Sequence, residues 1–395
     1  MKKLLLILVA MVYLFAFSNY AAAEQPNKLS IVTTIFPAYD WVKNILGEDL
    51  ENVDLVMLLN DGADLHSYQP TAKDIATIAS ADLFVCVGGE SDEWVDGVLK
   101  SANNPNLQVI KMEDLVEARP EEVVEGMQEE AHDHHHHQDE DHDHDHAEAD
   151  HDHDHAEADH DHAEADHDHD HAESDHDHDH AEADHDHDHT EADHDHDHAE
   201  ADHDHDHEHA HTHDGEPVND EHVWLSLKFA HRIVGAIAER LAELNPEKAE
   251  MYRTNAAAYQ KELMALDRQY QAVVDSAARR DILFADRFPF RYLADDYGLK
   301  YSAAFVGCSA ETEASFETIA YLAGKVNQLD LPAVFTIEGA THKIADTVIQ
   351  NSGKTDVKVL TMNSMQSVTT KQVEEGLSYL DVMKANLAAL EAGLK

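Results

Sequence analysis

The segment from His132 to His213 is the feature that most limits how this chain can fold. It holds 31 of the 35 histidines and 34 of the 82 acidic residues in the sequence, and it has no lysine or arginine. Only alanine and a few small polar residues interrupt the histidines and acids, so the segment cannot bury enough apolar surface to offset its ordering entropy. We therefore expect a disordered insertion over residues 120–220, with folded sequence on both sides of it.

The insertion repeats the phrase "ADHDHDHAE", which is read first from Ala149 and recurs with small changes at a period of nine residues. Neutral imidazole is a common ligand for zinc, copper and nickel. In an extended chain, residues two apart project to the same side, so "HDHDH" presents several imidazoles together. The repeat favours an accessory metal-binding tract, and a solvated acidic spacer is the alternative. The tract includes His132, His134, His151, His153, His167, His169, His185, His187, His203, His205 and His213.

The charge outside the tract bears on the choice of partner. There the sequence has 48 acidic residues against 27 basic ones. Nucleic acids and anionic membranes attract basic surfaces, so neither is an expected partner of this chain. The excess of acids favours a cationic ligand.

The N-terminal residues have the three parts of a secretory signal peptide. Lys2 and Lys3 precede an apolar run over residues 4–17, and three alanines follow at 21–23. This order predicts a cleaved signal peptide over residues 1–23 and a location in the periplasm or elsewhere outside the cytoplasm. An uncleaved anchor is the alternative. The two cysteines, Cys86 and Cys308, are too few for a disulfide framework, and two buried thiols are favoured over one bridge.

Short β-rich runs alternate with helical patterns on both sides of the insertion, which predicts parallel sheets covered by helices. Strands are expected at 29–36, 53–59 and 82–88, and again at 281–286, 301–306, 333–339 and 357–362. A strong amphipathic helix starts near residue 226, and a second helix of about 30 residues begins near Pro246, a residue that suits a helix start. The expected fold is α/β, with two helix-covered lobes joined by a long rigid helix. The expected division is an N-terminal lobe over 24–119 and 221–245, a connecting helix over 246–278, and a C-terminal lobe over 279–395.

Four histidines lie outside the tract, and two of them suit a binding site. His66 lies in the loop "NDGADLHSYQPT", directly after an expected strand. Ligands of open α/β sheets bind beyond the carboxyl ends of the strands, so this loop is well placed for a site. His222 precedes the amphipathic helix in "NDEHVWLSL". His231 and His342 are expected to serve packing or helix capping.

Four segments together resemble the ZnuA-type zinc-binding proteins of bacterial ABC importers. They are "DGADLHSYQPT", "EHVWLSL", "RYLADDYGL" and the C-terminal "LSYLDVMKANLAAL". The His-rich insertion between His66 and His222 is also similar in position to a loop of that family. The resemblance implies two lobes joined by a long helix, one metal ion in the cleft between them, and delivery to a membrane permease driven by an ATPase.

The resemblance assigns the first two metal ligands to His66 and His222, but the rest of the ligand set departs from the family. Arg287, in "ADRFPFRYL", stands where the third histidine belongs, and a guanidinium has no lone pair for a metal. Gln366 stands at the apparent position of a fourth ligand that is often acidic. Asp286 is the first candidate to complete the site and Cys308 the second. Weaker candidates are Glu311, Glu313, Glu338 and the histidines of the tract.

The sequence thus predicts a binding protein that captures Zn²⁺ and delivers it to an ABC permease. A periplasmic metal buffer or chaperone working through the tract is the alternative, as is manganese, nickel or copper as cargo. No enzyme is expected, since the sequence has no Gly-rich phosphate loop, nucleophile elbow or His-Glu-x-x-His helix. A metallohydrolase at the cleft metal is the remote alternative. We expect a monomer, and a periplasmic metallochaperone is a further candidate partner.

Overall fold

A computed structural model describes residues 28–102, 104–127, 218–309, 312–339 and 341–395. These residues all belong to one compact unit of the chain. The expected signal peptide and the histidine tract lie outside the described residues. Within the described part of the chain, no helix is both long and apolar enough to span a membrane.

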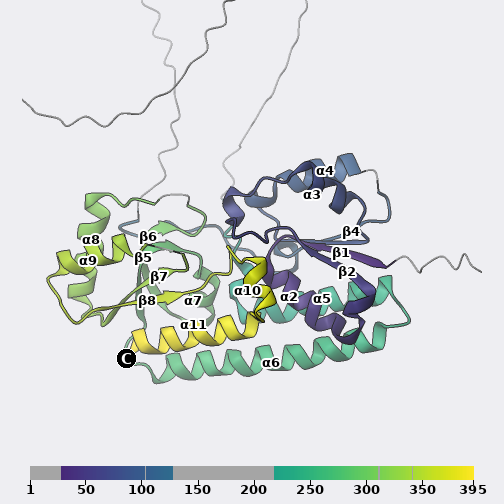
Figure 1. The fold of residues 1–395 in the computed structure, drawn as a ribbon. Coiled ribbons are helices and arrows are strands. Elements are labelled where there is room, and N and C mark those ends of the chain that lie inside the picture. The colour runs from purple at the N-terminus through teal and green to yellow at the C-terminus, as the bar shows by residue number, and fades with distance from the viewer. Residues whose placement is uncertain (1–27, 103, 128–217, 310–311, 340) are drawn as a thin grey trace, which may run out of the picture. The chain divides into compact units, whose positions relative to one another are not determined.

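The N-terminal lobe is built on a sheet of four parallel strands in the order β2-β1-β3-β4 (Figure 1). The two inner strands carry mostly buried apolar side chains, as expected for a parallel sheet that is covered on both faces. The strands and helices of this part are β1 (Leu29–Thr33), α2 (Phe36–Leu46), β2 (Val53–Met57), α3 (Ala72–Ala79), β3 (Leu83–Cys86), α4 (Trp94–Ala102) and β4 (Gln108–Lys111).

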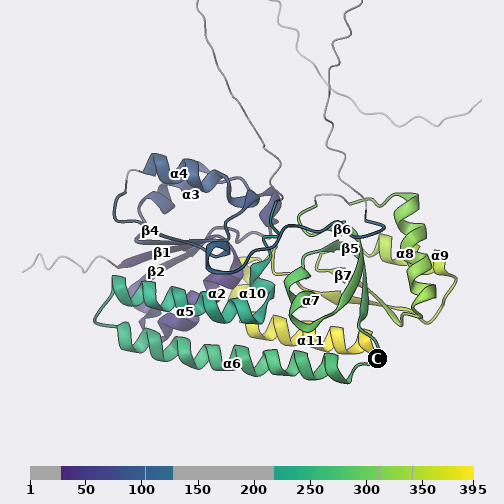
Figure 2. The ribbon, with the colours of Figure 1, turned by 180° about the vertical axis from the view of Figure 1, so that it is seen from behind.

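The C-terminal lobe repeats this plan with four parallel strands in the order β6-β5-β7-β8. Helices α8 and α9 lie together against this sheet at the end of the molecule away from the first lobe (Figures 1 and 2). The elements are β5 (Asp281–Phe288), α7 (Arg291–Tyr297), β6 (Lys300–Val306), α8 (Phe316–Gln328), β7 (Ala333–Ile337), α9 (Lys343–Ser352), β8 (Lys358–Met362) and α10 (Thr370–Glu374).

Three long helices lie along one side of the molecule, and the longest of them passes beneath both lobes. Helix α5 (Leu227–Leu244) is capped by the Ser226 hydroxyl and packs on α6 (Ala249–Ser276). Figure 2 shows α6 passing beneath both sheets, with the C-terminal helix α11 (Tyr379–Leu394) beside it. Tyr270 of α6 donates a hydrogen bond to the Met383 carbonyl of α11, at 2.6 Å. The long helix therefore holds the lobes together from one side.

The structure confirms the predicted fold of two α/β lobes with helix-covered parallel sheets. It adds β4, a short edge strand that the sequence pattern did not predict, because only one of its four residues is buried. The described chain also continues to Met127 and resumes at Val218, within the range assigned to the insertion. There, the Glu121 amide donates to the Val218 carbonyl, a long-range contact that no local sequence pattern predicts.

Candidate metal centre

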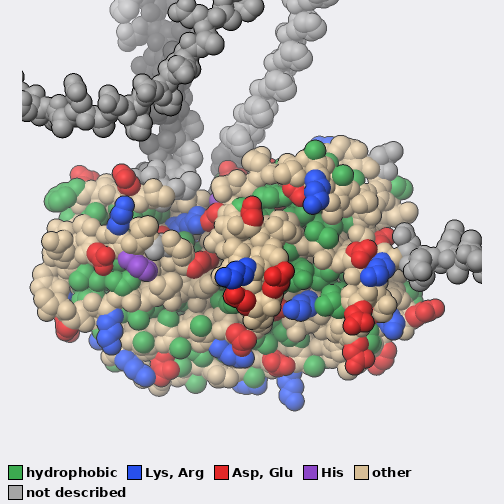
Figure 3. All heavy atoms as spheres, viewed as in Figure 1, with side chains coloured by type: hydrophobic (Ala, Val, Ile, Leu, Met, Phe, Trp, Pro, Cys, Tyr) green, Lys and Arg blue, Asp and Glu red, His purple; other side chains and the backbone are tan. Residues whose placement is uncertain are grey.

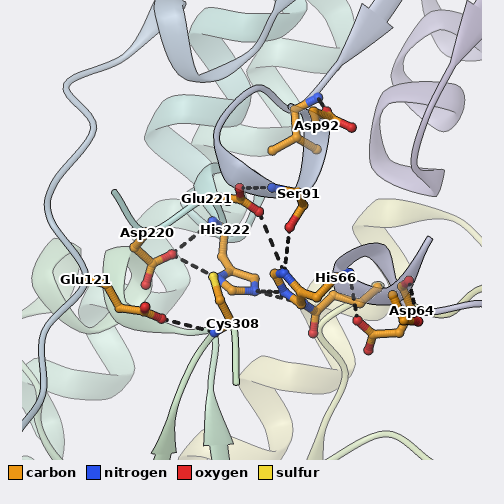
Figure 4. A network of polar contacts seen from close by, with 12 residues as sticks. Asp64, His66, Ser91, Asp92, Glu121, Asp220, Glu221, His222 and Cys308 are labelled. Carbon is orange, nitrogen blue, oxygen red and sulfur yellow. Dashed lines mark hydrogen bonds and ion pairs between the residues drawn. The ribbon is translucent and has the colours of Figure 1, made fainter. Parts of the chain in front are cut away.

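His66, His222 and Cys308 come together between the two lobes (Figure 4). Their potential ligand atoms all lie within 4.8 Å of one another, and they form the only such group of three or more found among the described residues. The sequence predicted all three as candidates. Two imidazole nitrogens and one sulfur are typical ligands of zinc.

The topology of the two sheets explains why these residues meet. His66 lies in the short 3₁₀ turn η2 (Leu65–Ser67) that follows β2, and Cys308 follows β6. His222 precedes the 3₁₀ turn η5 (Val223–Leu225), which leads into α5. Gly307 allows the close approach, because a Cβ atom there would lie 2.9 Å from Cε1 of His222. The loops beyond the carboxyl ends of β2 and β6 thus face each other across the site.

His222 is fully buried and its ring has a fixed orientation. Its Nδ1 lies 2.9 Å from Oδ1 of Asp220, and the same oxygen accepts the His222 backbone N–H. A carboxylate can only accept, so Nδ1 carries a proton and Nε2 is the ring nitrogen left to face the site. A carboxylate behind a histidine is the usual outer partner of a metal ligand. Asp220 was not among the residues predicted from the sequence, although an acid two residues before His222 is a signal that could have identified it.

His66 has a hydroxyl partner on its outer nitrogen. Its Nδ1 lies 2.7 Å from Oγ of Ser91 and 3.7 Å from Oε2 of Glu221. Burial, and then the neighbouring His222, lower the pKa of His66 to about 3. The ring is therefore neutral at physiological pH, which is the form that binds metals.

Burial and three neighbouring carboxyl groups disfavour ionisation of the Cys308 thiol. Burial raises the pKa of the thiol well above its usual range, and Glu121, Glu221 and Asp220 raise it further. Burial also raises the pKa of Glu221 to about 7. The Cys308 backbone N–H donates to Oε1 of Glu121 at 3.0 Å. Such surroundings disfavour a free thiolate and favour a cation that would compensate its charge.

Arg287 joins the loops that carry two of the candidate ligands. One guanidinium nitrogen pairs with Oδ2 of Asp64, and the other donates to the Ser309 carbonyl at 3.3 Å. Asp64 in turn accepts the backbone N–H of His66 through Oδ1 at 3.0 Å. Burial raises the pKa of Asp64, but the Arg287 charge and hydrogen bond outweigh it, so the net shift is downward. Arg287 thus fixes the His66 loop against the residue after Cys308.

Asp286 does not join the cluster of His66, His222 and Cys308. Its carboxyl oxygens accept backbone N–H groups, from Arg287 at 2.9 Å and from Ile337 at 3.3 Å. It lines a neighbouring cavity of about 510 Å³, to which His66 also contributes. The sequence ranked Asp286 above Cys308, but the structure places Cys308, and not Asp286, in the cluster. Asp286 lies within β5, and its carboxylate accepts the Ile337 backbone N–H of β7.

The weaker candidates lie elsewhere or have other partners. Glu338 accepts hydrogen bonds from the Ser364 backbone and hydroxyl, at 2.6 and 2.7 Å. Glu313 is exposed and is not part of the cluster. Glu311 and the tract histidines lie outside the described residues. Both cysteines are free thiols, and Cys86 is buried in the core of the N-terminal lobe.

Two parallel-sheet lobes, joined by a long helix and enclosing a buried group of potential metal ligands, define a two-lobed metal-binding protein. Residues 31–393 match the ZnuA family, described as "Zinc-uptake complex component A periplasmic", so the chain belongs to this family.

The relatives include proteins named for zinc. The chain is 29% identical over 392 residues to the "Zinc-binding lipoprotein AdcA" of Streptococcus pneumoniae, which covers 99% of this chain and 61% of that protein. It is 28% identical over 375 residues to the "High-affinity zinc uptake system protein ZnuA" of Bacillus subtilis, over 95% of this chain and 90% of that protein. This chain therefore spans about three-fifths of the length of AdcA and most of that of ZnuA.

Solved structures agree with the fold. The Zn(II)-bound ZnuA-like domain of AdcA from S. pneumoniae aligns with a TM-score of 0.59 at 24% identity, covering 93% of this chain and 99% of that one. The metal-dependent lipoprotein YcdH of B. subtilis aligns with a TM-score of 0.61 at 23% identity, over 93% and 99% of the two chains. At this identity the likeness supports the two-lobed fold and nothing finer.

Proposed function

We propose that this protein captures zinc outside the cytoplasm and delivers it to an ABC-type permease and its ATPase, with His66, His222 and Cys308 as zinc ligands. One observation carries the proposal: one ring nitrogen of each histidine and the Cys308 sulfur converge within 4.8 Å of one another. Around tetrahedral zinc, a sulfur and a nitrogen ligand lie about 3.5 Å apart, so a small side-chain adjustment would close this group on an ion.

The ligand types favour zinc over manganese or iron. A thiolate is a soft ligand, and imidazole suits zinc, copper and nickel, whereas manganese prefers oxygen. The carboxylate of Asp286 already accepts two backbone N–H groups, so an oxygen-rich site would need a rearrangement of β5 around this residue. Relatives of this chain that are named for zinc support the same preference. The periplasmic description of the family and the N-terminal sequence support an extracytoplasmic location.

The histidine tract serves in this proposal as an accessory collector. Its 31 imidazoles provide many sites that raise the local concentration of metal near the folded unit. Each such site requires a flexible segment to be ordered, so it binds more weakly than a preformed group of ligands. In this proposal the folded centre binds zinc tightly, and the tract supplies zinc to it from weaker sites.

Zinc titration of the full chain and of a variant lacking residues 132–213, in competition with a chelator of known affinity, tests this division. One tight zinc site should survive the deletion, and manganese should compete poorly for it. Loss of all tight binding with the tract would instead support the metal-buffer function. Tight manganese binding by the shortened protein would contradict zinc as the preferred cargo.

A further inference from the structure

Gln366 places its side-chain amide between the two histidines of the candidate centre. Its Nε2 lies 2.7 Å from Nε2 of His66 and 2.8 Å from Nε2 of His222. Gln366 is 2% exposed, so the water that could replace these contacts is excluded. An amide nitrogen has two protons and no lone pair to share, so it donates one hydrogen bond to each ring.

The two imidazoles receive these hydrogen bonds on the lone pairs that a metal would need. His222 holds its proton on Nδ1 because Asp220 accepts it, which leaves Nε2 as the acceptor. The two Nε2 atoms lie 3.2 Å apart. Two nitrogen ligands on tetrahedral zinc are about 3.3–3.4 Å apart, so the pair already has nearly the spacing of ligands. Hydrogen bonding to the amide and binding of zinc by this pair therefore exclude each other.

The amide oxygen of Gln366 competes with Glu338 for the single hydroxyl proton of Ser364. Oε1 of Gln366 lies 2.9 Å from Oγ of Ser364, and that hydroxyl also lies 2.7 Å from Oε1 of Glu338. A serine hydroxyl has one proton, so it can donate to Glu338 or to Gln366 but not to both. If the amide were turned by 180°, its Nε2 would donate to Ser364 and the hydroxyl would donate to Glu338. The Ser364 hydroxyl would then accept a hydrogen bond from the Gln366 amide and donate one to Glu338, with no competition for its proton.

We propose that Gln366 is a metal-dependent amide switch in the zinc site. Without zinc, its NH₂ group donates a hydrogen bond to Nε2 of each histidine and keeps these two nitrogens close together. With zinc, the amide turns, its carbonyl Oε1 becomes an oxygen ligand, and its NH₂ group donates to Ser364. This inference rests on the zinc site proposed above and adds a fourth ligand to it.

The distances require the amide to move as well as turn. In the structure, Nε2 of Gln366 lies 2.7 and 2.8 Å from the two histidine nitrogens. A carbonyl oxygen bound to tetrahedral zinc would lie about 3.3 Å from each of them. A withdrawal of roughly 0.5 Å is therefore needed. A neutral carbonyl also leaves the zinc with less ligand charge than a carboxylate would. We infer that glutamine at this position favours release of the ion.

The switch is tested with three variants of the full chain, Gln366→Ala, Gln366→Glu and Gln350→Ala. Gln350 is an exposed residue of α9 and serves as the matched control. Zinc affinity is measured by chelator competition, the release rate by transfer of zinc to excess EDTA, and zinc coordination by X-ray absorption on samples with one equivalent of zinc. Selective ¹⁵N-glutamine labelling follows the Gln366 amide, assigned from its absence in Gln366→Ala.

We expect Gln366→Ala to weaken the tight site by roughly 10- to 100-fold and to remove one oxygen from its coordination shell. Gln366→Glu should slow zinc release by a similar factor, since it keeps an oxygen ligand and adds charge. The Gln366 NH₂ resonances should shift on addition of zinc, and the Gln350→Ala protein should behave as wild type. Opposite effects of alanine and glutamate would not follow from a role in packing alone.

The proposal fails if wild-type protein binds zinc tightly while its Gln366 amide resonances stay unchanged, or if both Gln366 variants bind and release zinc as wild type does. Either result would leave the zinc site of His66, His222 and Cys308 in place. The proposed function itself fails in a different way, namely if the wild-type protein has no tight zinc site.

Discussion

The N-terminal lobe brings two imidazoles to the candidate centre, whereas the C-terminal lobe brings a thiol, a guanidinium and an amide. Each imidazole has a polar partner on its outer nitrogen, Asp220 for His222 and Ser91 for His66. Arg287 and Gln366, on the other side, reach across to contact the first lobe. The N-terminal lobe thus offers two candidate ligands with oriented rings, whereas the C-terminal lobe offers the third candidate together with groups that reach across to the first lobe.

The largest expected effect comes from removing one of the oriented ligands. His222→Ala should lower zinc affinity by more than the roughly 100-fold typical of losing an outer partner, since it removes a ligand and leaves Asp220 buried without its imidazole. Isothermal titration measures the loss. His231→Ala, on the amphipathic helix α5, is the control and should leave zinc binding unchanged. If His222→Ala kept wild-type affinity, the N-terminal lobe would not be the source of oriented ligands.

The second prediction tests by spectroscopy whether the C-terminal lobe contributes a sulfur ligand. Cys308→Ser should abolish the intense sulfur-to-metal charge-transfer absorption of the Co²⁺-substituted protein and weaken zinc binding, because a hydroxyl is a poorer zinc ligand than a thiolate. Cys86→Ser is the control, since Cys86 is buried in the first lobe and its sulfur contacts the Ile110 carbonyl. An unchanged cobalt spectrum in Cys308→Ser would exclude sulfur from the site.

The link between the lobes through Arg287 should have a smaller effect. Arg287→Gln removes the ion pair with Asp64. The side chain of Arg287 is 17% exposed and that of Asp64 is 23% exposed. Because both are partly exposed, we expect a loss of about 1–2 kcal/mol in the free energy of unfolding, below the 3–5 kcal/mol of a fully buried pair. Urea denaturation measures it. The exposed pair of Arg280 and Asp275 gives the control, since Arg280→Gln should cost less than about 1 kcal/mol. Equal losses in the two variants would remove the special role of Arg287.

The smallest effect concerns a buried charge beside the oriented ligands. Burial raises the pKa of Asp92 to about 6, against its hydrogen bonds from the Val87 and Gly88 backbone. A raised pKa means that the folded protein keeps a proton that the unfolded chain has lost. The stability from this group is therefore present below pH 4 and is lost as the pH rises through 6.

Asp92→Asn should therefore be more stable than wild type at pH 7.5, by about 1 kcal/mol and at most about 3 kcal/mol. The amide oxygen can still accept both backbone N–H groups. The difference between the two proteins should disappear toward pH 4, as thermal denaturation across this range would show. A constant difference at every pH would mean that Asp92 has the same pKa in the folded and unfolded protein.

On the face that Figure 3 shows, surface charge does not distinguish the lobes, because acidic and basic side chains are interspersed over both. What differs is the buried chemistry between them, which the sequence reveals only in part. His66 and His222 stand out because histidine is scarce outside the tract and both follow recognisable motifs. Cys308 carries no local motif that separates a ligand from a core residue, so the sequence left it second to Asp286.

By itself, the sequence determined the two α/β lobes, the long helix between them and the two histidines, because periodic burial and short motifs are local properties of a chain. Only the tertiary structure decided the rest of the site. Arg287 and Asp64, or Gln366 and His66, are hundreds of residues apart, and each finds its partner only after both sheets have formed. Whether an acid, a thiol or an amide faces the two imidazoles depends on where a turn directs its side chain, and that direction is set by long-range packing.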